Sequence, residues 1–269
     1  MIALGCMRLS TAKDRDDTRA LAVLHAALEA GVELLDTADA YAHDATEVGH
    51  NERLIAQALA GRRAFVVTKG GLVRPGGAWV PDGRARHLDA AARASRDRLG
   101  VDALDLYLLH AVDPKIPLAT SVRALAKLRD QGVARAIGLS NVGLHQLEQA
   151  LAIAPIDAVE IELSPWHLDA VRGGLLAACK QRDIRVLAHR PLGGPGGVKR
   201  IARDERLAEI AARLHATPAE IVLAWLRRLG VTPLPGATRP ETARSAARAL
   251  DLPEADACAL DTHFVAIAE

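Results

Sequence analysis

A regular alternation of short apolar runs with longer amphipathic segments constrains this chain more than any other feature. Eight runs of five or six residues are mostly apolar, and a segment with a helical repeat of apolar residues follows each of them. Short apolar runs are typical of parallel strands buried on both faces, and the longer segments are typical of helices that cover such strands. Eight strand–helix repeats predict a (β/α)8 TIM barrel, which is an α/β fold.

The predicted strands are residues 2–6, 32–36, 64–69, 105–110, 134–139, 158–163, 184–189 and 231–235. The predicted helices are residues 16–30, 52–60, 88–99, 118–128, 144–153, 175–179, 221–229 and 242–250, with one additional helix at 205–214. Glycines follow several of these segments, as Gly100 and Gly230 do, and a glycine at this place typically ends a helix. Residues 217–220 read as a capping box with proline at the first helical position.

An open, doubly wound sheet is the alternative architecture. No G-x-G-x-x-G motif follows an early strand, and the glycine-rich residues 193–197 lack both the spacing and the Lys-Ser/Thr pair of a phosphate-binding P-loop. No linker or shift in composition divides the chain. We therefore expect residues 1–269 to form a single barrel domain.

Charge and aromatic content exclude some classes of partner. Lys and Arg number 34 against 33 Asp and Glu, and aromatic residues make up only 3% of the chain. A balanced charge disfavours nucleic acid and anionic membrane surfaces, and so few rings disfavour a base-stacking platform. The expected partner is a small molecule, and the expected assembly is a monomer or a weak homo-oligomer.

The cysteines and the N-terminal sequence indicate a compartment. Cys6, Cys179 and Cys258 are far apart and form no C-x-x-C motif, so we expect reduced thiols and neither a disulfide framework nor a metal site. No signal-peptide pattern opens the chain, and no stretch approaches the ~18 apolar residues of a membrane span. These features predict a cytoplasmic protein.

Polar residues follow the predicted strands where a barrel places its active site, at the carboxyl ends. Asp36 ends the second predicted strand, Lys69 the third and His110 the fourth. Tyr41 follows Asp36 in the same loop. Because these ends surround one mouth, the four side chains are expected to meet there.

These four residue types can reduce a carbonyl group together. A desolvated Asp36 and Lys69 are expected to form an ion pair. The Lys69 ammonium is expected to lower the pKa of Tyr41 and make it a general acid near neutral pH. His110 can orient a carbonyl oxygen by a hydrogen bond, so the predicted reaction is hydride transfer with protonation of the oxygen.

The same motifs resemble those of the aldo-keto reductase family. The resemblance rests on D-T-A-D-A-Y with Asp36 and Tyr41, V-T-K-G-G with Lys69, L-Y-L-L-H with His110, and G-L-S-N ending at Asn141. Residues 70–83, 186–194 and 233–242 resemble the corresponding loops of bacterial members. The chain looks like a short form that lacks the N-terminal hairpin, and its brief tail predicts an open mouth without a long C-terminal lid.

The resemblance implies a barrel that binds NADPH, with NADH as the alternative, and reduces an aldehyde or ketone. It implies Tyr41 as the proton donor, Asp36 and Lys69 as its tuning pair, and His110 as the residue that orients the carbonyl. The implied cofactor residues are Ser140, Asn141, Glu160 and His189 at the nicotinamide, Pro191, Leu192 and Gly193 at the pyrophosphate, and Gly236, Thr238, Arg239 and Arg244 at the adenosine phosphate. An arginine there would read a 2′-phosphate, which favours NADPH.

Three departures from the family pattern concern the cofactor. Glu160 stands where glutamine is usual, and a carboxylate can only accept hydrogen bonds, so we expect tighter binding of the positively charged oxidised nicotinamide. His189 stands where an aromatic ring usually stacks on the nicotinamide, and Ser245-Ala246 replaces an acidic-Asn pair at adenine. Met7, Trp79 and Trp166 are the candidates for the wall of the substrate pocket.

Two other functions remain open from the residues alone. A barrel of this kind can serve as a cofactor-binding regulatory protein with weak catalysis. Lys69 can also serve as the Schiff-base lysine of an aldolase, because such lysines lie on barrel strands.

Overall fold

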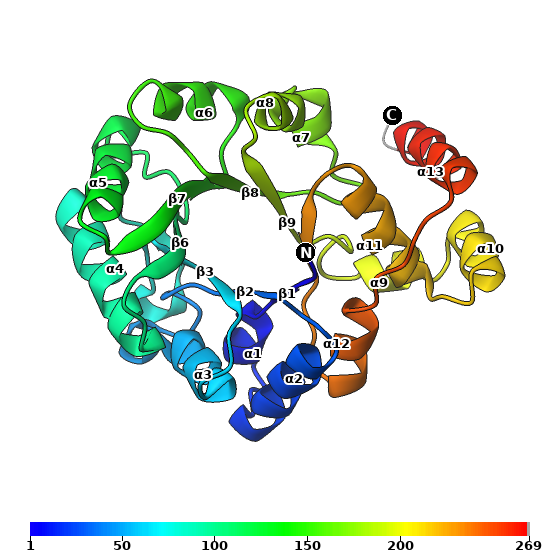
Figure 1. Ribbon diagram of the computed structural model, residues 1–269, viewed down its shortest axis with the longest axis horizontal. Coiled ribbons are helices and arrows are strands. Elements are labelled where there is room, and N and C mark those ends of the chain that lie inside the picture. Colours follow the sequence, from blue (N-terminus) through cyan, green and yellow to red (C-terminus); the bar gives the residue numbers. More distant parts are fainter. Residues whose placement is uncertain (268–269) are drawn as a thin grey trace.

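Eight parallel strands form one sheet that curls into a nearly closed barrel with helices on its outside (Figure 1). The computed structural model describes the backbone of residues 1–267 and the side chains of residues 1–264. The strands are β1 (Ala3–Gly5), β2 (Leu34–Asp36), β3 (Phe65–Gly70), β6 (Leu104–Leu109), β7 (Ala134–Ser140), β8 (Ala158–Glu162), β9 (Arg185–His189) and β10 (Thr232–Leu234), in this spatial order. Gly5 bridges Gly236 in parallel, which brings the first and last strands together. The predicted (β/α)8 barrel is confirmed, and each predicted strand overlaps an observed one, with boundaries that differ by one or two residues.

The helices surround this sheet. They are α1 (Met7–Thr11), α2 (Asp17–Glu29), α3 (His50–Leu59), α4 (Ala85–Leu99), α5 (Leu118–Asp130), α6 (Leu144–Leu151), α7 (Asp169–Arg172), α8 (Leu175–Gln181), α9 (Gly197–Ile201), α10 (Glu205–Arg213), α11 (Pro218–Arg228), α12 (Pro240–Ala246) and α13 (Glu254–Ile267). A hairpin of β4 (Leu72–Val73) and β5 (Val80–Pro81) follows β3. No helix among the described residues is long and apolar enough to cross a bilayer.

Some element boundaries differ from the prediction. The helix predicted at 242–250 starts two residues earlier, because Pro240 takes the first helical position, and ends at Ala246. The short helices α1, α7 and α9 have too few turns for an apolar repeat to show in the sequence. The terminal helix α13 and the β4–β5 hairpin were also not predicted.

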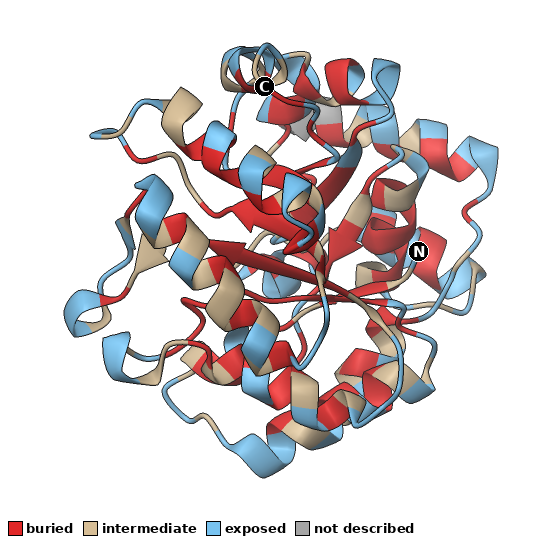
Figure 2. Cartoon of the chain, turned by 60° about the vertical axis from the view of Figure 1, so that its left-hand side comes forward, coloured by how far each residue is buried: buried red, intermediate tan, exposed pale blue. Residues whose placement is uncertain are grey.

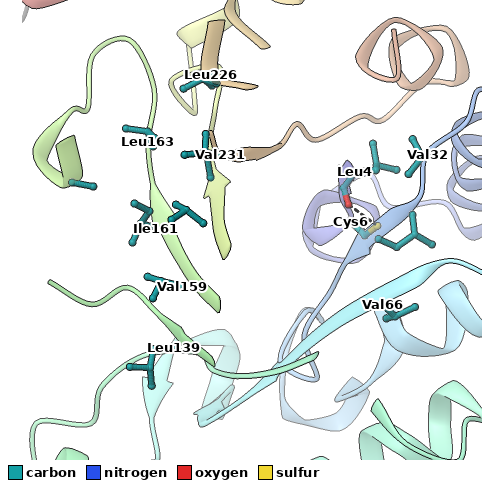
Figure 3. Packing of buried hydrophobic residues seen from close by; sticks show 14 of the residues in the cluster. Leu4, Cys6, Val32, Val66, Leu139, Val159, Ile161, Leu163, Leu226 and Val231 are labelled. Atoms are coloured by element: carbon teal, nitrogen blue, oxygen red, sulfur yellow. Dashed lines mark hydrogen bonds between the residues drawn. The ribbon is translucent and has the colours of Figure 1, made fainter. Parts of the chain in front are cut away.

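Two apolar layers hold the barrel together. A small layer fills its interior and consists of Ala3, Leu34, Val67, Leu106, Leu108, Ala158, Leu187 and Leu234. A larger layer lies between the strands and the helices, where Figure 3 shows Leu4 of β1 and Val159 and Ile161 of β8. The strands are therefore buried on both faces, while the outer faces of the helices remain exposed (Figure 2).

Tyr107 of β6 belongs to the outer layer and is fully buried. Its hydroxyl donates a long hydrogen bond to the Leu88 carbonyl at 3.4 Å. A Cβ atom at Gly70 would lie 2.0 Å from this hydroxyl, so the neighbouring strand must carry glycine there. Tyr107 is therefore a core residue and does not face the mouth of the barrel.

Candidate active site

The strand period places five polar side chains at the inner mouth of the barrel. On each of five strands a polar residue lies two positions after an interior apolar one: Asp36 after Leu34, Lys69 after Val67, His110 after Leu108, Glu160 after Ala158, and His189 after Leu187. Residues two apart on a strand share a face. The five side chains therefore point inward, one layer beyond the interior apolar residues and at the carboxyl ends of the strands.

The ammonium group of Lys69 is the centre of this cluster. It donates hydrogen bonds to Asp36 Oδ1 at 2.5 Å, to the Thr37 carbonyl at 3.0 Å and to the Tyr41 hydroxyl at 3.1 Å. Glu160 Oε2 lies 3.2 Å from the same nitrogen. The expected pairing of Asp36 with Lys69 is confirmed by these distances, and Lys69 has no solvent exposure.

The neighbouring carboxyl groups keep Lys69 charged. Burial alone would lower the pKa of Lys69, but Asp36 and Glu160 together raise that pKa well above its ordinary value. Burial raises the pKa of Asp36, while the adjacent Lys69 opposes this change. The lysine is therefore an ammonium ion throughout the physiological pH range.

Tyr41 is buried beside this ammonium group. Its oxygen accepts the hydrogen bond from Lys69, and among the described residues its own proton is donated to no protein group. Burial raises the pKa of Tyr41, and Lys69 lowers it by less than burial raises it. The expected net lowering of the Tyr41 pKa is therefore wrong for the free protein, because burial outweighs the lysine charge, and Asp36 and Glu160 add to the effect of burial.

His110 lies at the end of β6, edge-on to Tyr41 with ring centroids 5.6 Å apart. Burial, followed by Lys69, lowers the pKa of His110 well below its ordinary value. The ring is therefore neutral at pH 7 and carries one N–H. Its Nδ1 atom is buried without a partner among the described groups, which leaves Nε2 as the candidate to face a ligand.

Glu160 is nearly fully buried on β8. Its Oε2 atom makes no hydrogen bond with the described groups although it lies near Lys69. Burial, followed by the proximity of Asp36, raises the pKa of Glu160 from 4.5 to about 8. Glu160 is thus mainly a carboxylic acid at neutral pH and can donate a hydrogen bond, contrary to the expectation that it only accepts them.

Ser140, Asn141 and His189 lie side by side next to Glu160. The Asn141 backbone has φ of 58°, a left-handed conformation that asparagine tolerates, and its N–H donates to the Glu160 carbonyl at 2.9 Å. The Asn141 side-chain amide donates to the His110 carbonyl at 3.0 Å, and its oxygen lies 3.0 Å from His189 Nε2. Burial lowers the pKa of His189 to about 3, so this ring is also uncharged.

Pro191, Leu192 and Gly193 lie in the loop after β9, and their contact with a pyrophosphate stays a prediction. Gly193, Gly194 and Gly196 all have positive φ values, which gives this loop a tightly curved backbone. A Cβ atom at Gly193 would lie 2.8 Å from the Trp166 ring.

Trp166 packs on this loop and not on the four catalytic candidates. The Arg200 guanidinium lies 4.3 Å from the centre of its ring. Trp166 also lines a cavity of about 480 Å³ with Gly196, Lys199, Arg200, Arg203 and Asp204. The ring contacts of Trp166 are thus with Arg200 and the loop after β9, whereas those of Trp79 are with Tyr41 and His110.

The predicted adenosine-phosphate residues lie after β10. Gly236, Thr238 and Arg239 are in the loop, and Arg244 is exposed in the last turn of α12. Thr238 and Arg239 line a cleft of about 220 Å³ that also contains Arg8, Arg15, Arg19, Asp14 and Asp16. Because four arginines and two aspartates line this cleft, its side chains carry a net positive charge.

Trp79, on the loop between β4 and β5, reaches the catalytic cluster. Its ring lies edge-on to both Tyr41 and His110, with centroids 6.3 Å apart in each case, and 44% of the residue is exposed. Met7 is exposed at the first position of α1. Trp79 thus presents an exposed ring beside Tyr41 and His110, and its place in a substrate pocket stays a prediction.

Arg74 supports this wall and was not predicted. Its guanidinium lies 3.6 Å from the centre of the Trp79 ring, and its Nη2 atom donates to the His43 carbonyl at 2.9 Å. Arg74 is buried, and its Nε and Nη1 atoms have no hydrogen-bond partner among the described groups. The sequence gives no signal for this stacking. Arg74 stands five residues before Trp79 in a loop, and a charged residue in a loop is normally exposed.

The chain resembles known proteins along almost its whole length. The sequence profile of the aldo/keto reductase family matches residues 1–263. A thermostable aldo-keto reductase solved with the inhibitor epalrestat is 30% identical, with a TM-score of 0.81 over 97% of this chain and 93% of the other. An aldo/keto reductase from Klebsiella pneumoniae, solved with NADP and acetate, is 26% identical, with a TM-score of 0.82 over 98% and 90%. A glycerol dehydrogenase from Gluconobacter oxydans shares the fold at 24% identity, with a TM-score of 0.83 over 99% and 91%.

Proposed function

Because the chain belongs to the aldo/keto reductase family, and is thereby an NAD(P)H-dependent oxidoreductase, we propose that it reduces an aldehyde or a ketone to the alcohol. Tyr41 donates the proton in this proposal. The observation that carries it is the hydroxyl of Tyr41, which accepts from Lys69 at 3.1 Å and keeps its own proton free for a ligand. A positioned acid of this kind is what carbonyl reduction needs as negative charge develops on the oxygen.

Each residue of the cluster has a separate role in the proposed reaction. Tyr41 transfers its proton to the carbonyl oxygen, and the Lys69 ammonium stabilises the tyrosinate that remains. Asp36 holds Lys69 in place and keeps it charged. Neutral His110 donates a hydrogen bond to the carbonyl oxygen and thereby orients it.

The residues at the mouth fit a nicotinamide cofactor. The hydroxyl of Ser140, the amide of Asn141 and the unpartnered oxygen of Glu160 provide both donors and acceptors for a carboxamide group. The loop at 191–197 presents a glycine-rich backbone that can approach a pyrophosphate closely. The cofactor supplies the hydride when it is bound.

NADPH is the proposed cofactor, with NADH as the weaker alternative. Arg239 lies in a cleft with a positive balance, and Arg244 is exposed on the adjacent helix. A guanidinium group binds a phosphate through two parallel hydrogen bonds, which the unphosphorylated ribose of NADH does not offer. The solved relative from Klebsiella pneumoniae contains NADP, which supports the same choice.

Trp79 is the proposed wall of the substrate pocket, and the substrate is a small carbonyl compound. Its exposed ring beside Tyr41 and His110 favours a substrate with an apolar or aromatic group next to the carbonyl. Met7 and Trp166 remain candidates at the rim. A monomer or weak homo-oligomer in the cytoplasm is the setting we propose.

The aldolase alternative is disfavoured by the state of Lys69. A Schiff base requires a neutral amine that can reach the substrate carbonyl. Lys69 is fully buried, and its carboxyl neighbours raise its pKa well above the ordinary value. The regulatory alternative is disfavoured because hydrogen bonds join Asp36, Lys69 and Tyr41, and the His110 ring lies edge-on beside Tyr41.

A panel of aldehydes, ketones and sugars, each with NADPH and with NADH, tests the proposal. We expect carbonyl-dependent loss of the reduced-cofactor absorbance in the wild-type protein. Tyr41→Phe should nearly abolish reduction while NADPH still binds, as measured by cofactor fluorescence. Tyr107→Phe is the matched control, because Tyr107 is buried away from the mouth and makes only a long hydrogen bond. Full activity of Tyr41→Phe would refute its role as the acid.

A further inference from the structure

We propose that Glu160 and Asp36 hold one proton between them, and that Lys69 passes this proton to Tyr41 after each carbonyl reduction. This inference rests on the proposed function. It assigns Glu160 a role as a proton-relay residue that acts through Lys69, in addition to any contact it makes with the cofactor.

The hydrogen-bond count around Lys69 is the first argument. An ammonium group has three protons, and these are donated to Asp36, to the Thr37 carbonyl and to Tyr41. Glu160 Oε2 lies 3.2 Å from the nitrogen outside these three contacts. The Asp36 carboxyl group is also within hydrogen-bonding reach of Glu160, but two carboxylates offer no proton to each other unless one of them is protonated. A buried carboxylate oxygen without a donor is costly, whereas a carboxylic acid with its own proton is not.

The charge balance of the mouth is the second argument. Burial raises the pKa of the Cys6 thiol and lowers the pKa values of His110 and His189, so all three groups are neutral at pH 7. Tyr41 is also protonated, because burial raises its pKa.

One ammonium group therefore faces two carboxyl groups inside the barrel. Lys69 neutralises one carboxylate, and a second bare carboxylate would leave an uncompensated negative charge in a buried site. The stable arrangement keeps one proton on the carboxyl pair. The pKa of Glu160, raised to about 8 by burial and then by Asp36, agrees with this arrangement.

Two short steps connect the stored proton to Tyr41. During reduction the O–H bond of Tyr41 breaks and its proton goes to the substrate oxygen. The tyrosinate then takes a proton from the Lys69 ammonium across 3.1 Å, and the resulting amine takes the proton of the Glu160 carboxyl across 3.2 Å. Glu160 is left as a carboxylate, and water supplies its proton again after the product leaves.

The burial of Lys69 and Glu160 explains why a proton held on the carboxyl pair would be useful. Lys69 has no exposed surface, and Glu160 is only 2% exposed. With a substrate and a cofactor over the mouth, solvent has no direct access to Lys69. An internal proton allows Tyr41 to recover before the site opens.

Time-resolved infrared spectroscopy of a single turnover tests the relay. The wild-type protein at about pH 7 should show a carbonyl-stretch band that Glu160→Gln lacks, because the pKa of Glu160 is about 8. The variant is needed to assign this band, because burial also raises the pKa of Asp39 well above its ordinary value. We expect this band to disappear with hydride transfer. At about pH 9 the band should be absent before the reaction begins. A band that persists through hydride transfer, or that is missing at about pH 7, would overturn the proposal.

Two variants on the same strand separate the relay from a structural effect. Glu160→Gln should lack this band at both pH values. Glu162→Gln is the matched control, because Glu162 is partly exposed and pairs with Arg190 at 3.1 Å, and it should keep the band and its loss.

Steady-state reduction provides a second readout that a merely structural role would not change. The kcat of the wild type and of Glu162→Gln should fall above about pH 8, whereas Glu160→Gln should show no break there. An unchanged break in the pH profile of Glu160→Gln would contradict the relay.

If Glu160→Gln does not fold, the infrared comparison of the wild-type protein at the two pH values still tests the relay. Reduction without loss of the band refutes the relay alone, whereas absence of reduction in the wild type refutes the proposed function as well.

Discussion

Replacing Glu160 with glutamine should make the stability of the protein much less dependent on pH. In the unfolded chain this carboxyl group ionises near 4.5, whereas burial and Asp36 raise its pKa to about 8 in the folded protein. Between these values the folded state binds more protons than the unfolded state, so stability falls as pH rises. The stabilisation that the protonated Glu160 side chain provides is fully present below about pH 4.5, and it is lost as the pH rises through about 8.

The size of this effect follows from the same two pKa values. Each tenfold change in an equilibrium constant is worth about 1.4 kcal/mol, so a rise from 4.5 to about 8 corresponds to a loss on the order of 5 kcal/mol in the free energy of unfolding. Glutamine has nearly the same shape as glutamate and does not titrate. The variant should therefore be close to the wild type at about pH 5 and several kcal/mol more stable at about pH 9.

Urea unfolding at several pH values measures this difference. The control is again Glu162→Gln, whose side chain is partly exposed and paired with Arg190. We expect the control to follow the wild type throughout. A difference between Glu160→Gln and the wild type that stays constant from about pH 5 to about pH 9 would refute the raised pKa of Glu160, independently of any enzymatic activity.

Four other outcomes are expected. Arg239→Ala should weaken NADPH binding about 10- to 100-fold in a fluorescence titration and leave NADH binding nearly unchanged; equal losses would remove the case for phosphate recognition. Trp79→Ala should raise KM more for an aromatic aldehyde than for an aliphatic one, since it removes an aromatic contact surface; equal increases would argue against this wall. Gly70→Ala should destabilise the fold by about 1–3 kcal/mol, because its Cβ would lie 2.0 Å from the Tyr107 hydroxyl, and Tyr107→Phe should recover part of this loss in the double variant. The affinity for the oxidised cofactor, measured by calorimetry, should rise as Glu160 ionises above about pH 8, and Glu160→Gln should remove this rise.

Most of the barrel could be predicted because the relevant patterns are local. Apolar runs and helical repeats report which segments are buried, and the strand period predicts which residues face inward. Asp36, Lys69 and His110 were placed correctly for this reason, since each ends an apolar strand. The very short helices were missed because they span too few residues to show a repeat.

The parts of the site that were not predicted depend on contacts between distant segments. Arg74 stacks on Trp79 because the loop between β4 and β5 folds back, and nothing in the sequence indicates that this arginine is buried. Trp166 was grouped with Trp79, but it packs against the loop after β9.

The sequence by itself determined the barrel and the inward direction of its polar strand ends, because alternation and periodicity are properties of neighbouring residues. Only the tertiary structure decided the charge states within that mouth. Asp36, Lys69 and Glu160 come from three different strands, and their pKa values depend on burial and on one another. Burial and mutual distance are set by the whole fold. For this reason Glu160 is a neutral acid at pH 7, and Tyr41 keeps its proton more firmly than its lysine neighbour alone would predict.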